Sequence, residues 1–300
     1  MLNDHMAQDN ALSETGDSGP GLIFAVLAYV CWGFLPLYMK LLSHIPAIEV
    51  VAHRVVWSIP VAGLVLILLG RTGDVKAALS SPKMLAMGCV TAALISVNWG
   101  IYVWAITSGN ALEAALGYYI NPLFSIFLGF ALLGERLTWL QWLAIALASV
   151  AVLVLTLDAG RLPLVALALT VSFGLYAFCK KRLPIGPNQG FMLEVLILAL
   201  PAFGYWVWVT AQGTSHFEGS TWLLIGTGAV TAVPLLFYAN GAKRLRLTTI
   251  AILQYITPTM IFLVAVFLFD EPFGQARAIA FPMIWLALAL YTIPMLTRRA

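Results

Sequence analysis

Three ionisable side chains, Glu49, His53 and Arg54, lie close together in an otherwise apolar stretch of the sequence. Glu49 and His53 are four residues apart, so on a helix they share one face. A carboxylate and an imidazole in this arrangement can take up and release protons, and the guanidinium of Arg54 can bind a carboxylate of a solute. The alternative is a structural cluster of ions that fixes helix packing, with Glu113 as a further member.

Uncharged polar side chains also occur inside apolar segments, where an amide needs a hydrogen-bonding partner. They are Asn98 with Tyr102 one helical turn later, Asn121 before Pro122, and Gln254 before Tyr255. Each of these groups can contact a transported solute or bond to a neighbouring helix. The residues alone leave both alternatives open.

Several tryptophans and tyrosines lie deep within the apolar segments rather than at their ends. This deep set consists of Trp32, Trp57, Trp99, Tyr102, Tyr118, Tyr119, Tyr238 and Tyr255. Their N–H and O–H groups need polar partners, and their rings can stack on aromatic or cationic solutes. We expect several of them to line a central cavity, with core packing as the alternative for each one.

These residues belong to a chain of 300 residues that is 61% hydrophobic and 10% charged, with a net charge of +3. Soluble domains are close to half apolar and a quarter charged, so the composition excludes a soluble enzyme and a nucleic-acid-binding protein. It predicts an all-α polytopic membrane protein. Ten apolar segments are long enough to cross about 30 Å of hydrocarbon as helices. They cover residues 21–42, 47–69, 84–106, 112–133, 139–157, 162–180, 189–211, 221–242, 248–269 and 276–297.

Lysine and arginine are unevenly distributed over the connections between these segments. The face that holds the N-terminus carries twelve of the cations, and the opposite face carries three. Because cytoplasmic loops carry the excess of cations, both termini are predicted to be cytoplasmic in a bacterial-type inner membrane. Residues 1–20 are polar and lack the basic start of a signal peptide, so we expect a disordered cytoplasmic tail.

The second half of the sequence repeats the first. The motif Tyr119-Ile120-x-Pro122 recurs as Tyr255-Ile256-x-Pro258, at an offset of 136 residues. The two repeats, residues 21–157 and 158–300, hold five segments each, and because five is odd the second copy must enter the membrane from the opposite side. Secondary transporters use such inverted repeats to open a central site to either face.

The matched prolines Pro122 and Pro258 fall inside apolar segments. Each removes a backbone hydrogen bond and is expected to kink its helix, which leaves carbonyl groups for a cavity or for neighbouring protein. Paired kinks that line the central cavity are the functional interpretation. A device for helix packing is the alternative.

The repeat also assigns positions to several carboxylates. Glu194 is the counterpart of His53, but in an inverted repeat it lies near the inner face, so we expect it to meet Lys180 or Lys181 rather than His53. Glu135 and Glu271 follow matched segments. Because a helix C-terminus disfavours anions, we expect them to begin the next turn or to pair locally, with Arg136 and Arg277 as nearby partners.

The pattern of segments and motifs resembles the drug/metabolite transporter superfamily, EamA type. The resemblance rests on the ten segments, the repeat, Pro122 with Gly134-Glu135, and Pro258 with Asp270-Glu271-Pro272. Trp32-Gly33, Pro36-x-Tyr38-x-Lys40 and Glu49-x-x-x-His53-Arg54-x-x-Trp57-Ser58 are similar to the RarD-like subgroup. This resemblance implies an inner-membrane permease for small metabolites, often an exporter, and the subgroup is linked with chloramphenicol sensitivity.

The sequence therefore predicts a secondary-active transporter of a small metabolite or drug-like solute, in contact with the lipid bilayer and with protons as one coupling ion to consider. No ATP-binding motif, metal-ligand cluster or cofactor motif is present. A sensor or assembly subunit that carries no solute is the first alternative, and an intramembrane enzyme is the second. Small residues such as Ala144 and Ala148 allow close helix contact, either within the chain or in a homodimer.

Overall fold

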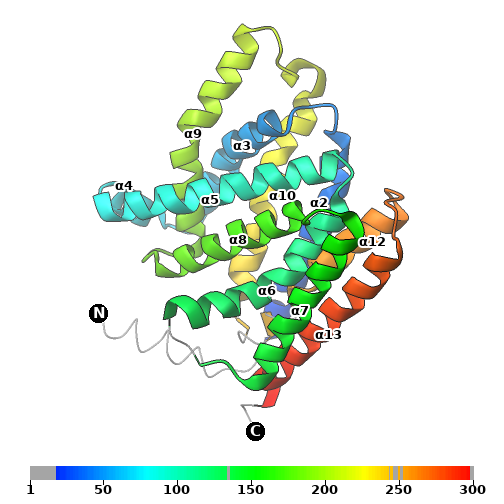
Figure 1. The fold of residues 1–300 in the computed structure, drawn as a ribbon. Helices are drawn as coiled ribbons and strands as arrows, with labels where there is room; N and C mark the ends of the chain where they lie inside the picture. The colour runs from blue at the N-terminus through cyan, green and yellow to red at the C-terminus, as the bar shows by residue number, and fades with distance from the viewer. Residues whose placement is uncertain (1–17, 134–135, 243, 246–248, 251–252, 298–300) are drawn as a thin grey trace, which may run out of the picture.

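The computed structural model describes residues 18–133, 136–242, 244–245, 249–250 and 253–297, and the regular secondary structure in these ranges is helical (Figure 1). The helices are α2 (Gly19–Leu41), α3 (Ala47–Leu68), α4 (Thr72–Leu79), α5 (Pro82–Thr107), α6 (Ala111–Leu133), α7 (Trp139–Ala159), α8 (Leu164–Arg182), α9 (Pro187–Ala211), α10 (Phe217–Ala242), α12 (Ile256–Phe267) and α13 (Gln275–Thr297). The predicted N-terminal tail lies outside the described residues except for its last three positions, where α2 begins after Ser18.

Eight of these helices are long and apolar enough to cross a membrane, judged by length and composition. They are α2, α3, α5, α6, α7, α9, α10 and α13. Helices α8 and α12 are apolar but shorter. The described residues thus form an all-helical bundle with eight candidate spans, and the predicted count of ten depends on α8 and α12.

The shortness of α12 has a cause in the sequence. Pro258 lacks the N–H that would bond to the carbonyl of Gln254 four residues earlier. The chain forms a turn at Gln254 and Tyr255, and α12 begins at Ile256. Helix α6, in contrast, continues through Pro122. The two matched prolines are therefore not equivalent in this conformation, because the helix is interrupted before Pro258 and continuous at Pro122.

Helix α4 is an element that the hydropathy pattern does not predict. It has eight residues, too few for a clear periodic signal. Its buried Val75 and Ala78 are three residues apart and lie on one face, and α4 packs against α9. The Gln189 amide donates a hydrogen bond of 2.9 Å to Asp74. Tertiary contacts therefore hold this short helix in place.

Helices from the two halves of the chain interleave. Helix α2 packs against α10 and α12, and α3 packs against α9 and α10. Helix α8 packs against α5 and α6. Figure 1 shows α7 running beside α13, which is the most extensive of these helix pairs. The bundle centre is therefore built from both halves of the sequence.

Small residues allow these helices to approach closely. Ala144, Ala148 and Ala151 of α7 are buried in the main core, on the helix that packs against α13. Their role is thus contact within the chain, and this stripe gives no support for the homodimer that the sequence leaves open. Gly228 of α10 likewise lies directly against the backbone of Trp57 in α3.

Replacing Gly228 with alanine is expected to lower the melting temperature. An added Cβ would overlap the carbonyl group of Trp57, a backbone atom that cannot rotate away. Overpacking of this kind costs roughly 1–3 kcal/mol, which corresponds to a decrease of about 2–10 °C for a chain of this size. Thermal unfolding in detergent would measure it. Gly204→Ala is the matched control, because its Cβ would enter open space, and equal melting temperatures for both variants would contradict the packing argument.

Candidate functional site

Arg54 of α3 is buried where α3, α5 and α10 meet, with 3% of its surface exposed. Its Nε donates a hydrogen bond of 3.0 Å to the Thr231 hydroxyl on α10. The guanidinium carbon lies 4.8 Å from the ring centroid of Trp99 on α5, in cation–π contact. Nη1 is buried without a hydrogen-bond partner. Helix packing thus brings a cation into the protein interior and leaves one of its donor groups unused.

Polar groups of α5 and α6 lie beside this guanidinium. The Tyr102 and Tyr118 hydroxyls are close enough to Arg54 for electrostatic interaction, and their ring centroids are 5.9 Å apart. Tyr118 donates a hydrogen bond of 3.4 Å to the Asn98 side-chain oxygen. The Tyr102 hydroxyl is buried and has no partner. A second unused polar group is therefore found next to Arg54.

Asn98 connects α5 to α8. Its amide nitrogen donates to the Leu169 carbonyl at 3.2 Å and to the Ser172 hydroxyl at 2.9 Å. With its oxygen bonded to Tyr118, the side chain is occupied by protein groups. The sequence left solute contact and interhelical hydrogen bonding open for Asn98. In this conformation Asn98 makes interhelical hydrogen bonds.

His53 is fully buried between α3, α9 and α10. Its ring stacks on Phe217, with centroids 5.2 Å apart, and meets the edge of Trp206 at 4.9 Å. The indole nitrogen of Trp57 lies 3.3 Å from Nδ1 of His53. Because an indole can only donate, Nδ1 is the acceptor and the neutral ring carries its proton on Nε2. That Nε2 has no partner.

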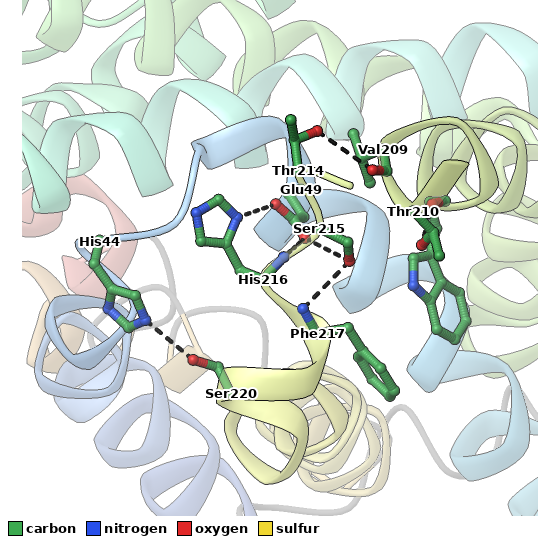
Figure 2. A network of polar contacts seen from close by, with 10 residues as sticks. His44, Glu49, Val209, Thr210, Thr214, Ser215, His216, Phe217 and Ser220 are labelled. Atoms are coloured by element: carbon green, nitrogen blue, oxygen red, sulfur yellow. Dashed lines mark hydrogen bonds and ion pairs between the residues drawn. The ribbon is translucent and has the colours of Figure 1, made fainter. Parts of the chain in front are cut away.

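Glu49 bonds to the connection between α9 and α10 rather than to His53. Its carboxylate accepts a hydrogen bond of 2.8 Å from the His216 backbone N–H and lies 2.7 Å from His216 Nδ1. The Ser215 hydroxyl donates to it at 3.3 Å. Figure 2 shows these groups converging on Glu49, with His44 bonded to Ser220 nearby at 3.0 Å.

The neighbouring residues Glu49, His53 and Arg54 therefore face three different environments. Glu113, which the structural alternative included as a further member, lies apart from them and pairs with Arg161 at 3.6 Å. His216 was missed by sequence reasoning. It lies 167 residues from Glu49 in a short polar connection, and no spacing pattern links the two.

The remaining deep aromatic residues form two further groups. Trp32 and Tyr238 are 5.8 Å apart between α2 and α10. Tyr119 of α6 lies 2.7 Å from the Thr259 hydroxyl of α12. These contacts bring helices of the two halves together. They correspond to core packing, the alternative to cavity lining for each of these residues.

The other predicted polar residues belong to α6 and to the segment where α12 begins. The Asn121 oxygen and the Tyr255 hydroxyl are buried without partners. Gln254 is half-buried at the turn that precedes α12. Pro258 is buried in the first turns of α12. The predicted residues of α6 thus face different neighbours: Tyr118 lies beside Arg54, Tyr119 contacts α12, and the Asn121 oxygen faces Gly174 of α8.

Glu194 pairs with Lys180, as predicted. Lys180 Nζ lies 2.6 Å from the Glu194 carboxylate, which also accepts a hydrogen bond of 3.2 Å from Tyr176. Glu194 is 1% exposed, while the Lys180 side chain is 20% exposed. A buried carboxylate of α9 is thus neutralised by a lysine of α8.

Glu271 does not pair locally with an arginine, so that expectation is wrong. Its two oxygens accept hydrogen bonds from the backbone N–H groups of Ala111 at 2.6 Å and Leu112 at 2.9 Å. Arg277 instead donates to the Pro272 carbonyl. The first N–H groups of a helix lack internal partners and attract anions, so the N-terminus of α6 is a better site for the carboxylate. Glu135 and any pairing it makes lie outside the described residues.

A cavity of about 280 Å³ lies near this capped end of α6. Glu113, Asp158, Arg161 and Arg277 are among its lining residues. Arg54 does not border it. Arg54 is instead packed against protein, with 3% of its surface exposed.

Comparison with known proteins identifies the family of this polytopic bundle. Residues 19–157 match the EamA-like transporter family. Protein RarD of Streptomyces exfoliatus is 43% identical over 276 residues, which cover 91% of this chain and 88% of that protein. The chain belongs to the EamA-like transporter family. Within it the chain is a RarD-like member of the drug/metabolite transporter superfamily, and it is a multi-pass bacterial membrane protein.

A further relative agrees with this assignment, and one solved structure shares the fold. An uncharacterized transporter of Vibrio cholerae is 39% identical and aligns over 92% of this chain and 93% of its own length. One solved crystal structure matches 93% of this EamA-like chain and 99% of its own, with a TM-score of 0.59 and 20% identity. At that identity the structural match shows the fold alone.

Proposed function

We propose that this EamA-like protein is a secondary-active inner-membrane transporter that exports a small metabolite or drug-like solute. The observation that carries the proposal is the buried Arg54, with unused hydrogen-bonding groups, between α3 and α5 of the first repeat and α10 of the second. Ionisable groups inside a membrane bundle are costly and mark solute or ion pathways. Alternating access around this centre would expose it to each face in turn.

Two inverted repeats, residues 21–157 and 158–300, underlie this mechanism. In these repeats α2 corresponds to α8, α5 to α10 and α6 to α12. The contact of α2 with α10 therefore corresponds to that of α8 with α5, and the contact of α2 with α12 to that of α8 with α6. All four contacts occur. Gly33 lies against Met260, and its counterpart Gly174 lies against Phe124, the counterpart of Met260. This correspondence of contacts supports two pseudo-symmetric repeats of five helices each.

Protons are proposed as the coupling ion. His53 has an unpartnered Nε2 in the interior, and Glu49 is a buried carboxylate in contact with an imidazole. Solute movement in liposomes that depends on an imposed pH gradient would support this coupling.

Solute counterflow with purified protein in liposomes tests the transporter proposal directly. The panel contains amino acids, organic acids, purine-related metabolites and chloramphenicol, and no coupling ion has to be known. Trp99→Ala is expected to reduce counterflow about tenfold or more, because the ring covers the guanidinium of Arg54. Trp222→Ala is the matched control, since Trp222 is 83% exposed and expected to face lipid.

The alternatives make different predictions for the same experiment. A sensor or assembly subunit would show no counterflow with any member of the panel although the protein is well folded. An intramembrane enzyme would release a chemically altered product. The names of the relatives favour a transporter over both, as the Vibrio cholerae protein illustrates.

A further inference from the structure

The charge of Arg54 has no counter-ion among the described residues. The buried carboxylates of this part of the chain are engaged elsewhere: Glu49 with His216, Glu194 with Lys180, and Glu271 with the backbone of α6. His53 beside Arg54 is a neutral ring in this conformation, because its Nδ1 accepts the Trp57 N–H. A guanidinium that is 3% exposed therefore lies in the interior with an uncompensated charge.

Such a charge is unfavourable for folding, and a function that requires it would explain its presence. Removing an ion from water costs several kcal/mol unless an opposite charge and hydrogen bonds replace the water. Arg54 receives one hydrogen bond acceptor, Thr231, and one aromatic face, Trp99. Nη1 remains without an acceptor. A bound anion would supply both the opposite charge and the hydrogen-bond acceptor that Arg54 lacks.

We propose that Arg54, Tyr102 and Trp99 form the binding site for the carboxylate of an organic monocarboxylate with an apolar or aromatic body. This inference rests on the proposed transport function and names the class of solute that the site takes. The Nη1 group and the Tyr102 hydroxyl are donors without partners, and a carboxylate offers two acceptor oxygens. Among the described residues Arg54 is the buried cation without a counter-ion, so a single negative charge balances it.

The side chains around the site indicate the chemistry of the part of the solute that carries the carboxylate. Trp99 covers one face of the guanidinium and lies near Phe191, with ring centroids 6.5 Å apart. Tyr118 is bonded to Asn98 and contributes mainly its ring. Rings of this kind favour apolar or aromatic bodies. Neutral solutes of the same shape leave the charge of Arg54 unbalanced, so we expect them to bind weakly.

Ligand binding to purified protein in nanodiscs tests the inference independently of transport. The probes are 3-phenylpropionate and its neutral amide, which share shape and differ in charge. The acid is expected to raise the melting temperature in a concentration-dependent way, whereas the amide has no effect at equal concentration. Arg54→Gln is expected to weaken binding of the acid about 100-fold, as expected for loss of a charge-assisted hydrogen-bonded pair, and Tyr102→Phe about tenfold.

The melting temperature without ligand distinguishes a binding role from a structural one. If Arg54 serves the solute, Arg54→Gln removes an uncompensated charge and is expected to raise this temperature by about 2 °C or more. A structural role would give a lower temperature. Arg71→Gln, at an exposed position outside the site, is the matched control and is expected to leave binding and stability unchanged.

The outcomes separate this inference from the proposed function. A stabilising effect of the acid that Arg54→Gln abolishes supports the site. Equal effects of acid and amide, or binding of the acid that persists in Arg54→Gln, overturns it. Counterflow of neutral solutes together with no binding of acids overturns the solute class and leaves the transporter. Acid binding without counterflow of any solute supports the site and overturns transport.

Discussion

Replacing Lys180 with methionine is expected to lower the free energy of unfolding by about 3–5 kcal/mol, the usual cost of removing one partner of a buried ion pair. Lys180 lies 2.6 Å from Glu194, and the carboxylate that would remain is 1% exposed. Tyr176 offers it one hydrogen bond, which cannot replace the lost charge. Denaturant titration in mixed micelles would measure the change.

The double variant Lys180→Met with Glu194→Leu provides the decisive comparison. Removing both charges leaves no ion without a partner, so most of the lost stability should return. Lys76→Met is the control, since Lys76 is exposed on α4. The stability of the double variant is compared with the sum of the losses in Lys180→Met and Glu194→Leu. If the double variant were no more stable than that sum predicts, the two charges would act independently and the ion pair would not contribute to stability.

Replacing Glu271 with alanine is expected to be the second large effect, a loss of about 3–6 kcal/mol. Both carboxylate oxygens accept backbone N–H groups in the first turn of α6, and each bond to a charged group contributes about 1.5–3 kcal/mol. Glu271→Gln removes the charge and one acceptor, so about half of the effect is expected. Unfolding experiments in detergent would rank the variants.

Hydrogen exchange gives a local measurement of the same contact. The amides of Ala111 and Leu112 should exchange slowly in the native protein and much faster in Glu271→Ala, because their acceptor is gone. Amides in the middle of α6 report on the helix as a whole. Glu218→Gln is the control, since Glu218 is exposed at the start of α10. Unchanged exchange at Ala111 and Leu112 would show that the cap does not hold in the membrane.

This contact also connects parts of the chain that are distant in sequence. Glu271 lies between α12 and α13, and the α6 residues that it caps are about 160 positions earlier. Glu49 makes a comparable connection from α3 to the segment before α10. In the predicted topology both contacts lie near the outer face. They are therefore suited to hold that side of the bundle closed.

The sequence by itself determined the class of the protein and the approximate course of its helices. Hydropathy is a local property that the thickness of the bilayer imposes on each segment, and it predicted α2, α3 and α7 to within about two residues at each end, the precision at which helix ends are defined. The Glu194–Lys180 pair was also accessible, because both residues lie near the same connection and the topology places them on one face.

The composition of the candidate site was decided by the tertiary structure. Spacing alone grouped Glu49, His53 and Arg54, yet helix packing directs Glu49 to His216 and Arg54 to Thr231. His53 accepts a hydrogen bond from Trp57, one turn later on its own helix. Two of these partners lie more than 160 residues away. Which side chains meet depends on the angles and rotations of packed helices, and no short-range pattern encodes those. The isolation of the Arg54 charge, the basis for the proposed solute class, therefore became visible only when all its neighbours had been placed.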